Sequence, residues 1–348
     1  MQQNIRLCNP PNRAEISFLS REQQTFLTDP YRFNPHTPDL VPRKEDLTLP
    51  VPVDFIWEAG AEFSTIQISD TPEFKTICRQ IKGSRRTLKN TMSRFRAKVS
   101  NLEHGKTWFW RVTDNRNVSE AQTFTVADQL PRWIRVEHVT NVRDLGNWKT
   151  TSGKRIRQGM LFRGAQFDPP WTNQPHGSRL TPKGKKVLME DLKIHTELDL
   201  RGCKGTPLKG IARYELLPFS AYASWRECGI FTDEQMQNVK KIFEIFADRK
   251  SYPVYFHCQG GGDRTGTAAF LLETMLGLSE EDCMTEYELS NLSVSGERSR
   301  FSREWTQFMA KFQTILPDGS LQEQVCEYLR RCGVSDAMQE KIRSLLLE

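Results

Sequence analysis

The chain has 348 residues and carries 49 Lys and Arg against 43 Asp and Glu, a formal net charge of +6. Its length exceeds that of one ordinary hydrophobic core and predicts two domains, and no apolar run is long enough to cross a membrane. The modest charge fits an enzyme for anionic substrates, but no basic stripe indicates nucleic-acid binding.

The first part of the chain, residues 1 to about 50, is rich in Pro and Asn, which interrupt any long element. One short helix is expected from Ser20 to Thr28. The next part, from Val51 to Val126, alternates apolar and polar residues in short runs separated by turn residues. Several such runs predict a β-sandwich, with strands expected at 54–57, 65–69, 107–112 and 121–126.

Aromatic side chains in these strands recur at every second position, as at Phe55 and Trp57 and again at Trp108 and Trp110. Such a stripe is typical of a core, although a ligand platform is the alternative. The turn before Trp108 resembles the corner of a fibronectin type III or related immunoglobulin-like module, with Trp108 in the place of its tyrosine. The resemblance implies an all-β domain without catalytic chemistry.

Residues 128–131 are expected to link this N-terminal part, 1–128 with the sandwich core at about 50–127, to a second domain at 129–348. In the second domain, predicted strands alternate with predicted helices, which indicates an α/β domain with a mainly parallel sheet flanked by helices. The expected elements are a strand at 195–201 and helices from Thr181 to about Leu192, after Thr232, from Ser279 to about Leu289, after Ser320 and through Leu346.

A glycine-rich segment from His257 to Gly266 connects two elements of the second domain. It follows an apolar run at 253–256 that predicts a buried strand and precedes a run at 268–276 that predicts a helix. A strand, a glycine turn and a helix N-terminus direct free backbone N–H groups and the positive end of a helix dipole into one concavity. This potential favours the nucleophilic thiolate form of Cys258. The planar guanidinium of Arg264 can hold two oxygens of a phosphoryl group.

The order Cys258, five residues, Arg264 and Thr265 resembles the signature loop of the cysteine-dependent protein tyrosine phosphatase superfamily. The resemblance covers about residues 132–348 and implies phosphomonoester hydrolysis without a metal or cofactor. A buried structural cysteine before a glycine turn is the alternative. The bacterial branch of the superfamily is resembled at Asn141 to Gly146, Leu161 to Gly164, Asp199 to Arg201 and Glu286 to Asn291.

In the mechanism that this resemblance implies, Cys258 attacks phosphorus and forms a phosphocysteine, which water then hydrolyses. Arg264 and the N–H groups of the loop would hold the equatorial oxygens of the phosphoryl group. The substrate-binding residues of the loop would be Gln259, Gly260, Gly261 and Gly262.

Further side chains are expected to assist. Thr265 would donate its hydroxyl to the sulfur of the nucleophile, and His257 would orient the loop from beneath. The general acid must come within about 3 Å of the departing oxygen, and Asp263 in the loop is the first candidate. Asp199, at the end of its strand, is the second candidate. Asp168 and Asp233 are others, on the connecting segments.

The expected substrate is a phosphotyrosine protein, with phosphoinositides or inositol polyphosphates as the alternative. Relatives that handle phosphoinositides commonly have a lysine at the position of Gly262, so its absence favours phosphotyrosine monoesters. Arg201, Lys204 and Lys209 could instead supply a basic rim. The loops at 164–180 and 202–232 would shape the pocket.

Two readings from other classes stay open: a phosphate-binding module without activity, and an adhesion or carbohydrate-binding role of the sandwich. The presence of both Cys258 and Arg264 disfavours the first, because a pure binder needs no thiolate. Arg143 and Asp144 are expected to form a structural ion pair rather than a catalytic one. The oligomeric state is left open.

The eight cysteines are scattered without Cys-x-x-Cys pairs, so neither a zinc site nor a disulfide framework is expected. The first residues lack the apolar core of a signal peptide. Immunoglobulin-like modules joined to bacterial enzymes resemble parts of exported proteins, which favours an extracytoplasmic location with a leader already removed. A cytoplasmic location is the alternative.

Overall fold

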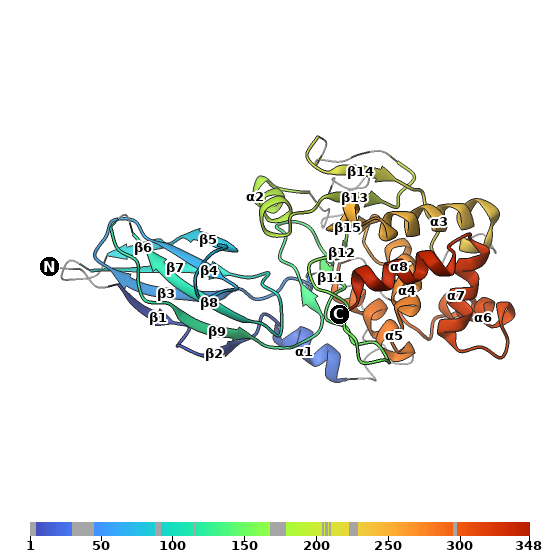
Figure 1. Ribbon diagram of the computed structural model, residues 1–348, viewed down its shortest axis with the longest axis horizontal. Helices are drawn as coiled ribbons and strands as arrows, with labels where there is room; N and C mark the ends of the chain where they lie inside the picture. Colours follow the sequence, from blue (N-terminus) through green and yellow to red (C-terminus); the bar gives the residue numbers. More distant parts are fainter. Residues whose placement is uncertain are drawn as a thin grey trace. The chain divides into compact units, whose positions relative to one another are not determined.

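The computed structural model describes residues 5–29, 45–87, 92–114, 116–167, 179–203, 205, 208, 210–222, 229–294 and 298–348. Its contacts divide the chain into two compact units, which we call the β unit and the α/β unit (Figure 1). The β unit consists of Met1–Ser20 and Pro50–Leu130, and the α/β unit of Arg21–Leu49 and Pro131–Glu348. The expected boundary after residue 128 lies close to the division after Leu130. The segment 21–49, which was expected in the N-terminal domain, instead groups with the α/β unit.

Two sheets form the β unit. The first, of order β1–β3–β7–β6, is antiparallel, and the second, of order β2–β9–β8–β4–β5, is antiparallel except between β2 and β9. Side chains of both sheets share one apolar cluster that includes the fully buried Phe55, Trp57 and Trp110, so the aromatic stripes are core. The strands are β1 (Arg6–Asn9), β2 (Ala14–Ile16), β3 (Val53–Ala59), β4 (Thr65–Ser69), β5 (Arg79–Lys82), β6 (Ser84–Thr87), β7 (Ser93–Val99), β8 (Thr107–Thr113) and β9 (Gln122–Val126).

Strand β7 shows most clearly why these residues form a sheet. Its Phe95 and Ala97 are buried, while the Arg and Lys residues between the apolar ones are exposed, as expected for one buried face. The sequence analysis did not assign this strand, although its apolar and basic residues alternate strictly. On the exposed face, Arg96 of β7 pairs with Asp54 of the neighbouring β3.

A six-stranded sheet of order β10–β11–β12–β15–β13–β14 forms the centre of the α/β unit (Figure 1). Four strands, from β12 to β14 in this order, run parallel, while β10 and β11 are antiparallel. The expected α/β fold with a mainly parallel sheet is therefore observed. The strands are β10 (Arg132–Trp133), β11 (Arg143–Asp144), β12 (Leu161–Gly164), β13 (Thr196–Asp199), β14 (Arg213–Leu216) and β15 (Val254–His257).

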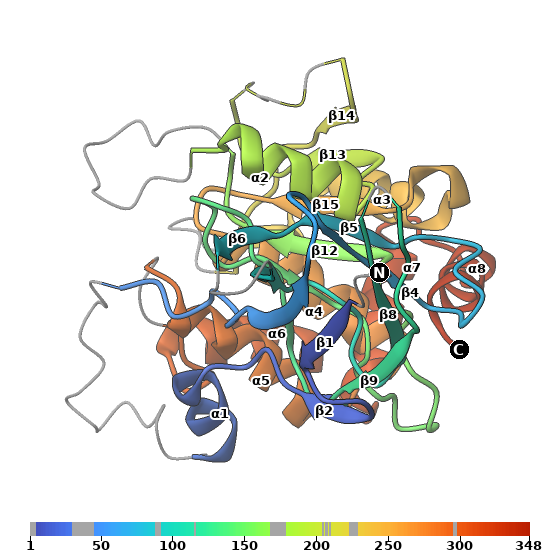
Figure 2. The ribbon, with the colours of Figure 1, turned by 90° about the vertical axis from the view of Figure 1, so that its left-hand side faces the viewer.

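Helices cover both faces of this sheet, and Figure 2 shows α2 in front of it. Tyr255 packs on one face in a cluster with Leu188 of η1, and its neighbour Phe256 packs on the other against Phe246 of α3. The helices are α1 (Arg21–Thr28), α2 (Pro182–Lys186), η1 (Val187–Asp191), η2 (Gly229–Phe231), α3 (Asp233–Ala247), η3 (Arg249–Ser251), α4 (Asp263–Leu276), α5 (Glu280–Glu288), η4 (Leu289–Leu292), α6 (Arg303–Ile315), α7 (Leu321–Arg331) and α8 (Asp336–Leu346).

Hydroxyl side chains mark the helix starts that the sequence predicted. Thr232, Ser279 and Ser320 each accept a hydrogen bond from the backbone N–H three residues further on. Helix α6 was not assigned from the sequence, although it buries three aromatic side chains on one face. None of the helices in the described ranges is long and apolar enough to cross a membrane.

Candidate active site

The glycine-rich segment connects β15 to α4, as the sequence predicted, and we call residues 258–264 the signature loop. Cys258 follows the last residue of β15 and is only 2% exposed. Arg264 lies in the first turn of α4 and is partly exposed, and its guanidinium forms no hydrogen bond or ion pair with the described residues. The first N–H groups of a helix have no carbonyl partner within it. The loop therefore carries a thiol at its start and a guanidinium at its end, beside the positive N-terminal end of α4.

Close packing explains one glycine of the loop. Gly261 has a φ of +72°, and a Cβ at this position would lie 2.5 Å from the carbonyl carbon and oxygen of Gly164. A side chain is thus excluded by backbone conformation and by space. Gly164 ends β12 and lies against Tyr255, whose hydroxyl donates to the carbonyl of Ala165 at 2.7 Å. The loop is therefore packed directly against the end of the neighbouring strand.

Side chains outside the loop hold its carbonyl groups. Asn141 Nδ2 donates to the carbonyl of Gly260 at 3.1 Å, and Arg163 Nη2 donates to that of Gly261 at 2.7 Å. In a trans peptide the N–H points opposite to the carbonyl. The N–H groups of Gly261 and Gly262 therefore point away from these two side chains, which leaves them free to face an anion.

His257 lies beneath the loop and is completely buried. Its Nε2 lies 3.0 Å from Glu197 Oε1 on the adjacent strand β13, and its Nδ1 lies 3.2 Å from the carbonyl oxygen of Cys258. Phe167 packs against the imidazole with a ring separation of 5.4 Å. These contacts hold the imidazole against the peptide that carries the thiol.

A buried ionic cluster lies behind the loop. Glu286 on α5 accepts hydrogen bonds from Arg143 and Arg163, and all three side chains are at most 1% exposed. Burial, followed by the charge of Arg163, lowers the pKa of Arg143 to about 10, so the guanidinium of Arg143 remains charged at neutral pH. Arg163 connects this cluster directly to the signature loop through Gly261.

Arg143 and Asp144 do not pair with each other, which corrects the expected ion pair. Asp144 instead pairs with Arg132 at 2.5 Å and accepts backbone N–H groups from Gly146 and Gly159. The reason is the strand period, because consecutive residues of β11 point to opposite faces. Arg143 points towards the loop and Asp144 points away from it.

Asp263 begins α4, and its side chain is 37% exposed. Arg298 Nη2 donates to its Oδ2 at 2.7 Å, and the Tyr222 hydroxyl donates to its Oδ1 at 3.3 Å. Burial, followed by the charge of Asp263, raises the pKa of Tyr222, so this phenol stays neutral. A Cβ at Gly262 would lie 3.0 Å from Nε and Nη2 of Arg298. The guanidinium of Arg298, which comes from a distant segment, therefore lies beside Gly262, a loop position that has no charged side chain of its own.

Asp199 and Arg201 form a buried pair. Arg201 donates to both carboxylate oxygens of Asp199, at 2.9 and 2.7 Å, and the Tyr214 hydroxyl donates to Oδ2 at 2.8 Å. Burial acts to raise the pKa of Asp199, but the bonds from Arg201 and the charge of His257 outweigh it and lower the pKa. Arg201 also donates to Gln166 Oε1 at 2.9 Å and is 3% exposed, so it does not form an exposed rim.

The remaining candidates divide into buried, exposed and undescribed residues. Thr265 is buried, and its Oγ1 has no hydrogen-bond partner within the described part of the chain. Gln259 is exposed on the loop, and Asp233 is exposed at the start of α3. Asp168, Lys204 and Lys209 lie outside the described residues. Among the described residues, no group of three or more His, Cys, Asp or Glu is placed to hold a metal ion.

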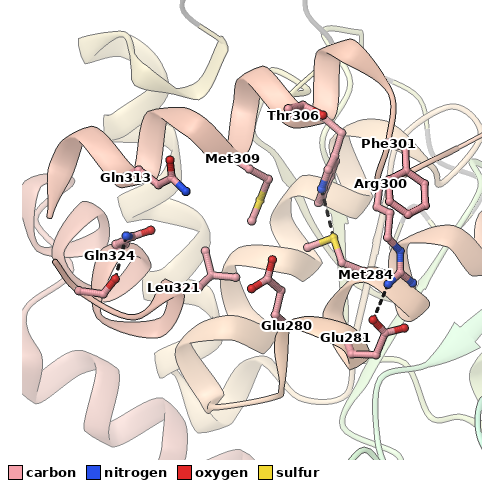
Figure 3. A pocket seen from close by; sticks show the side chains of 12 residues that line it. Glu280, Glu281, Met284, Arg300, Phe301, Thr306, Met309, Gln313, Leu321 and Gln324 are labelled. Atoms are coloured by element: carbon pink, nitrogen blue, oxygen red, sulfur yellow. Dashed lines mark hydrogen bonds and ion pairs between the residues drawn. The ribbon is translucent and has the colours of Figure 1, made fainter. Parts of the chain in front are cut away.

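A cavity of about 760 Å³ lies between α5, α6 and α7 (Figure 3). Met309 lines it from α6, and Arg300 pairs with Glu281 at 2.6 Å on another wall. Trp305 also lines it and donates its Nε1 to Met284 Sδ at 3.1 Å. No residue of the signature loop lines this cavity, so it is distinct from that loop.

Several residues around the loop were not assigned a role from the sequence. Arg163 and Glu286 lie in segments that resemble the bacterial branch, and for Arg163 a charged residue inside the otherwise apolar β12 was the available signal. Asn141 lies in another such segment. Arg298 follows the described residue 294 after a short gap and precedes α6, and nothing in its local pattern indicates its contact with Asp263.

The family model described as "Tyrosine phosphatase family" matches residues 134–348. A protein of Cupriavidus necator, provisionally named a tyrosine-protein phosphatase, is 26% identical in an alignment of 182 residues that covers 45% of this chain and 63% of that protein. The chain thus spans less than two thirds of the length of this curated relative.

Two solved structures are also similar. The core catalytic domain of the PP-IP phosphatase SIW14 from S. cerevisiae, in complex with citrate, is 17% identical with a TM-score of 0.31 and covers 48% of this chain and 86% of its own. A variant of TpbA from P. aeruginosa, in complex with phosphotyrosine, is 15% identical with a TM-score of 0.32. The match covers 52% of this chain and 91% of the TpbA chain. These scores are too low to support an argument about function. The family match covers more than half of the chain and includes the signature loop, and the chain therefore belongs to the tyrosine phosphatase family.

Proposed function

We propose that this protein is a phosphomonoester hydrolase that acts on phosphotyrosine with Cys258 as its nucleophile. The observation that supports this most is the position of Cys258 and Arg264 at the two ends of one glycine loop at a helix N-terminus. Membership of the tyrosine phosphatase family supports the same reaction. Binding alone would not need a thiol at this place.

The proposed reaction has two steps. In the first, the Cys258 thiolate attacks phosphorus, the bond from phosphorus to the phenolic oxygen breaks, and an acid protonates that oxygen. Arg264 and the loop N–H groups hold the three equatorial oxygens meanwhile. In the second, water attacks phosphorus, the S–P bond breaks, and inorganic phosphate leaves. The unpartnered Oγ1 of Thr265 is available to donate to the sulfur as it regains its negative charge.

Turnover by the purified full chain on phosphotyrosine peptides, phosphoserine peptides, phosphoinositides and inositol polyphosphates tests this proposal. We expect the phosphotyrosine peptides to react fastest. Cys258→Ser should abolish turnover while substrate still binds, and Arg264→Lys should lose about 10²–10³-fold in kcat because the bidentate fork is gone. Full activity of Cys258→Ser would contradict the proposal.

Asp263 is the proposed general acid. It lies in the signature loop, at the first residue of α4, and is partly exposed, so a leaving group can reach it. Asp199 is less suited, because it is completely buried and its lowered pKa keeps it ionised. Arg298 and Tyr222 would hold the Asp263 carboxyl towards the loop.

The leaving group distinguishes an acid from a bracing carboxylate. Asp263→Asn should slow hydrolysis of a phosphotyrosine peptide by about 10²–10⁴-fold. The same variant should affect much less an aryl phosphate whose leaving group needs no proton. Equal losses on both substrates would assign Asp263 a bracing role, and Asp199→Asn would then be the next variant to measure.

Phosphoinositide hydrolysis is the second candidate, and the position of Arg298 favours it. Although Gly262 itself has no charged side chain, the loop has a neighbouring cation. Arg298 lies where a side chain at Gly262 would point. Gly262→Lys would bring an ammonium against this guanidinium, so it should not simply add a phosphate-binding charge. If Arg298 binds a second phosphate, Arg298→Gln should lower the rate ratio of phosphoinositide to phosphotyrosine peptide. An unchanged ratio would show that Arg298 does not bind a second phosphate and that its role is limited to its contact with Asp263.

We also infer that the β unit is a fibronectin type III-like sandwich. Its two sheets share one apolar cluster, and Trp108 Nε1 donates to the carbonyl of Glu103 at 3.3 Å. This bond runs to a residue a few positions upstream, as the hydroxyl of a corner tyrosine would. An adhesion or carbohydrate-binding role of this unit is a separate proposal, which binding of the full chain to immobilised glycans would test.

A further inference from the structure

A short segment that precedes most of the β unit in the sequence belongs to the α/β unit. We call residues 45–49 the N-terminal strap. Leu47 is held from two sides, because its N–H donates to the carbonyl of Leu292 at 2.9 Å and its carbonyl accepts from Gln23 Nε2 at 2.8 Å. Gln23 lies on α1 and is completely buried. The strap and α1 are therefore attached to the α/β unit by buried, directional bonds.

Thr48 of the strap makes the contact that matters for the loop. It is 1% exposed, and its Oγ1 accepts a hydrogen bond from the backbone N–H of Asn141 at 2.9 Å while it donates to Asp46 Oδ1. Asn141 is fully buried and has a φ of +61°. A buried backbone N–H without a partner is costly. Thr48 therefore stabilises the left-handed conformation that directs the side chain of Asn141.

Every polar atom of the Asn141 side chain is used in this conformation. Nδ2 donates to the carbonyl of Gly260 at 3.1 Å and to Ser290 Oγ at 3.2 Å, and Oδ1 accepts from Arg143. If the Asn141 peptide turned, the amide would lose the carbonyl of the signature loop. Thr48 is thus connected to Gly260 through a single residue.

We propose that Thr48 is a positioning residue for the signature loop, so that the active site depends on a strap from the N-terminal side of the sandwich core. This inference rests on the proposed phosphatase function for its effect on turnover. Without the Thr48 hydroxyl, Asn141 no longer fixes the Gly260 carbonyl, and the adjoining N–H of Gly261 no longer points steadily at a phosphoryl oxygen. The electrostatic potential at the Cys258 thiol then varies, because the neighbouring N–H dipoles no longer keep one direction.

Thr48→Val in the full chain tests this inference, because valine keeps the shape and removes the hydroxyl. The conservative variant is Thr48→Ser, and the matched control is Thr25→Val on the exposed side of α1, where the hydroxyl bonds only to its own helix. Two quantities are measured: kcat and KM with an aryl phosphate, and the pH profile of Cys258 alkylation by iodoacetamide, followed by mass spectrometry of the Cys258 peptide.

We expect Thr48→Val to lower kcat about tenfold with little change in KM, and to shift the alkylation profile. Thr48→Ser should retain both properties, and Thr25→Val should equal the wild type. A Thr48→Val protein with wild-type kcat and alkylation would overturn the inference. So would a loss of activity that only follows the unfolded fraction seen by circular dichroism. If the wild type turns over no phosphate, the proposed function fails, but the alkylation comparison still tests Thr48 because it needs no substrate.

Discussion

The β unit and the α/β unit differ in where they place charge. The core of the β unit is apolar, and its ion pairs lie on the surface, as between Asp54 and Arg96, which are 29% and 55% exposed. The α/β unit instead buries charge beneath the signature loop, where Glu286 binds Arg143 and Arg163 out of contact with solvent. Other buried pairs of this unit are Arg132 with Asp144, Arg201 with Asp199, and His257 with Glu197.

This difference shows what each unit is built for. Burying an ion pair costs so much desolvation that an apolar replacement is often equally stable or more stable. A buried charge instead fixes the positions of its partners, because only one arrangement of them satisfies its hydrogen bonds. In this chain the buried charges and amides hold the carbonyls of Gly260 and Gly261. The β unit is stabilised by the apolar packing of its core.

The largest expected effect comes from breaking the buried cluster. Glu286→Gln leaves Arg143 and Arg163 without a counter-charge, which should lower the free energy of unfolding by about 3–5 kcal/mol. Urea unfolding of the purified variant measures this loss. Activity per folded molecule should fall as well, because Arg163 holds Gly261. A variant as stable and as active as the wild type would contradict the role given to buried charge.

A smaller effect is expected at Glu273 on α4. Burial, followed by the charge of Glu286, raises the pKa of Glu273 well above its usual range, and neither carboxyl oxygen has a partner among the described residues. Glu273 is then protonated in the folded state and ionised in the unfolded state at neutral pH. The unfolded state then binds fewer protons, so the free energy of unfolding falls by at most about 1.4 kcal/mol per pH unit between the usual Glu pKa of about 4.3 and the raised pKa of the folded state.

Glu273→Gln should remove this slope. The variant should gain stability relative to the wild type as the pH rises from acid to neutral, and urea unfolding at a series of pH values measures the difference. Parallel stability curves for the two proteins would show that Glu273 ionises in the folded state.

The smallest effect is expected at the surface of the β unit. Asp54→Asn removes an exposed ion pair with Arg96, and such pairs contribute little because water and salt screen them. The hydrogen bond from Arg96 lowers the pKa of Asp54, so any contribution is present above the usual Asp range and lost as the pH falls. Urea unfolding should detect little or no change. A loss as large as that of Glu286→Gln would remove the contrast between the units.

The sequence predicted the features that depend on neighbouring residues. The signature loop, its flanking strand and helix, and the stripe at Phe55 and Trp57 are local patterns, and each is observed. Two helix starts, at Ser279 and Ser320, follow from capping side chains in the same way.

Contacts between distant segments could not be predicted. Gly262 indicated a missing cation, but Arg298 supplies one from beyond α5, and no pattern within either segment shows that they meet. The contact between Thr48 and Asn141 likewise joins segments that are separated in the sequence by most of the β unit. A single sequence, read without an alignment of homologues, contains the residues of such pairs but does not show which residues contact each other.

The central claim is that Cys258 forms a covalent bond to phosphorus, and trapping that intermediate tests it most directly. The full chain is mixed with a phosphotyrosine peptide, denatured within the first turnover and digested, and the peptides are analysed by mass spectrometry. The account predicts a phosphoryl group on the Cys258 peptide of the wild type, at up to one per chain, and none in Cys258→Ser. Turnover by the wild type with no phosphoryl group on Cys258, or with the group on another residue, would contradict it.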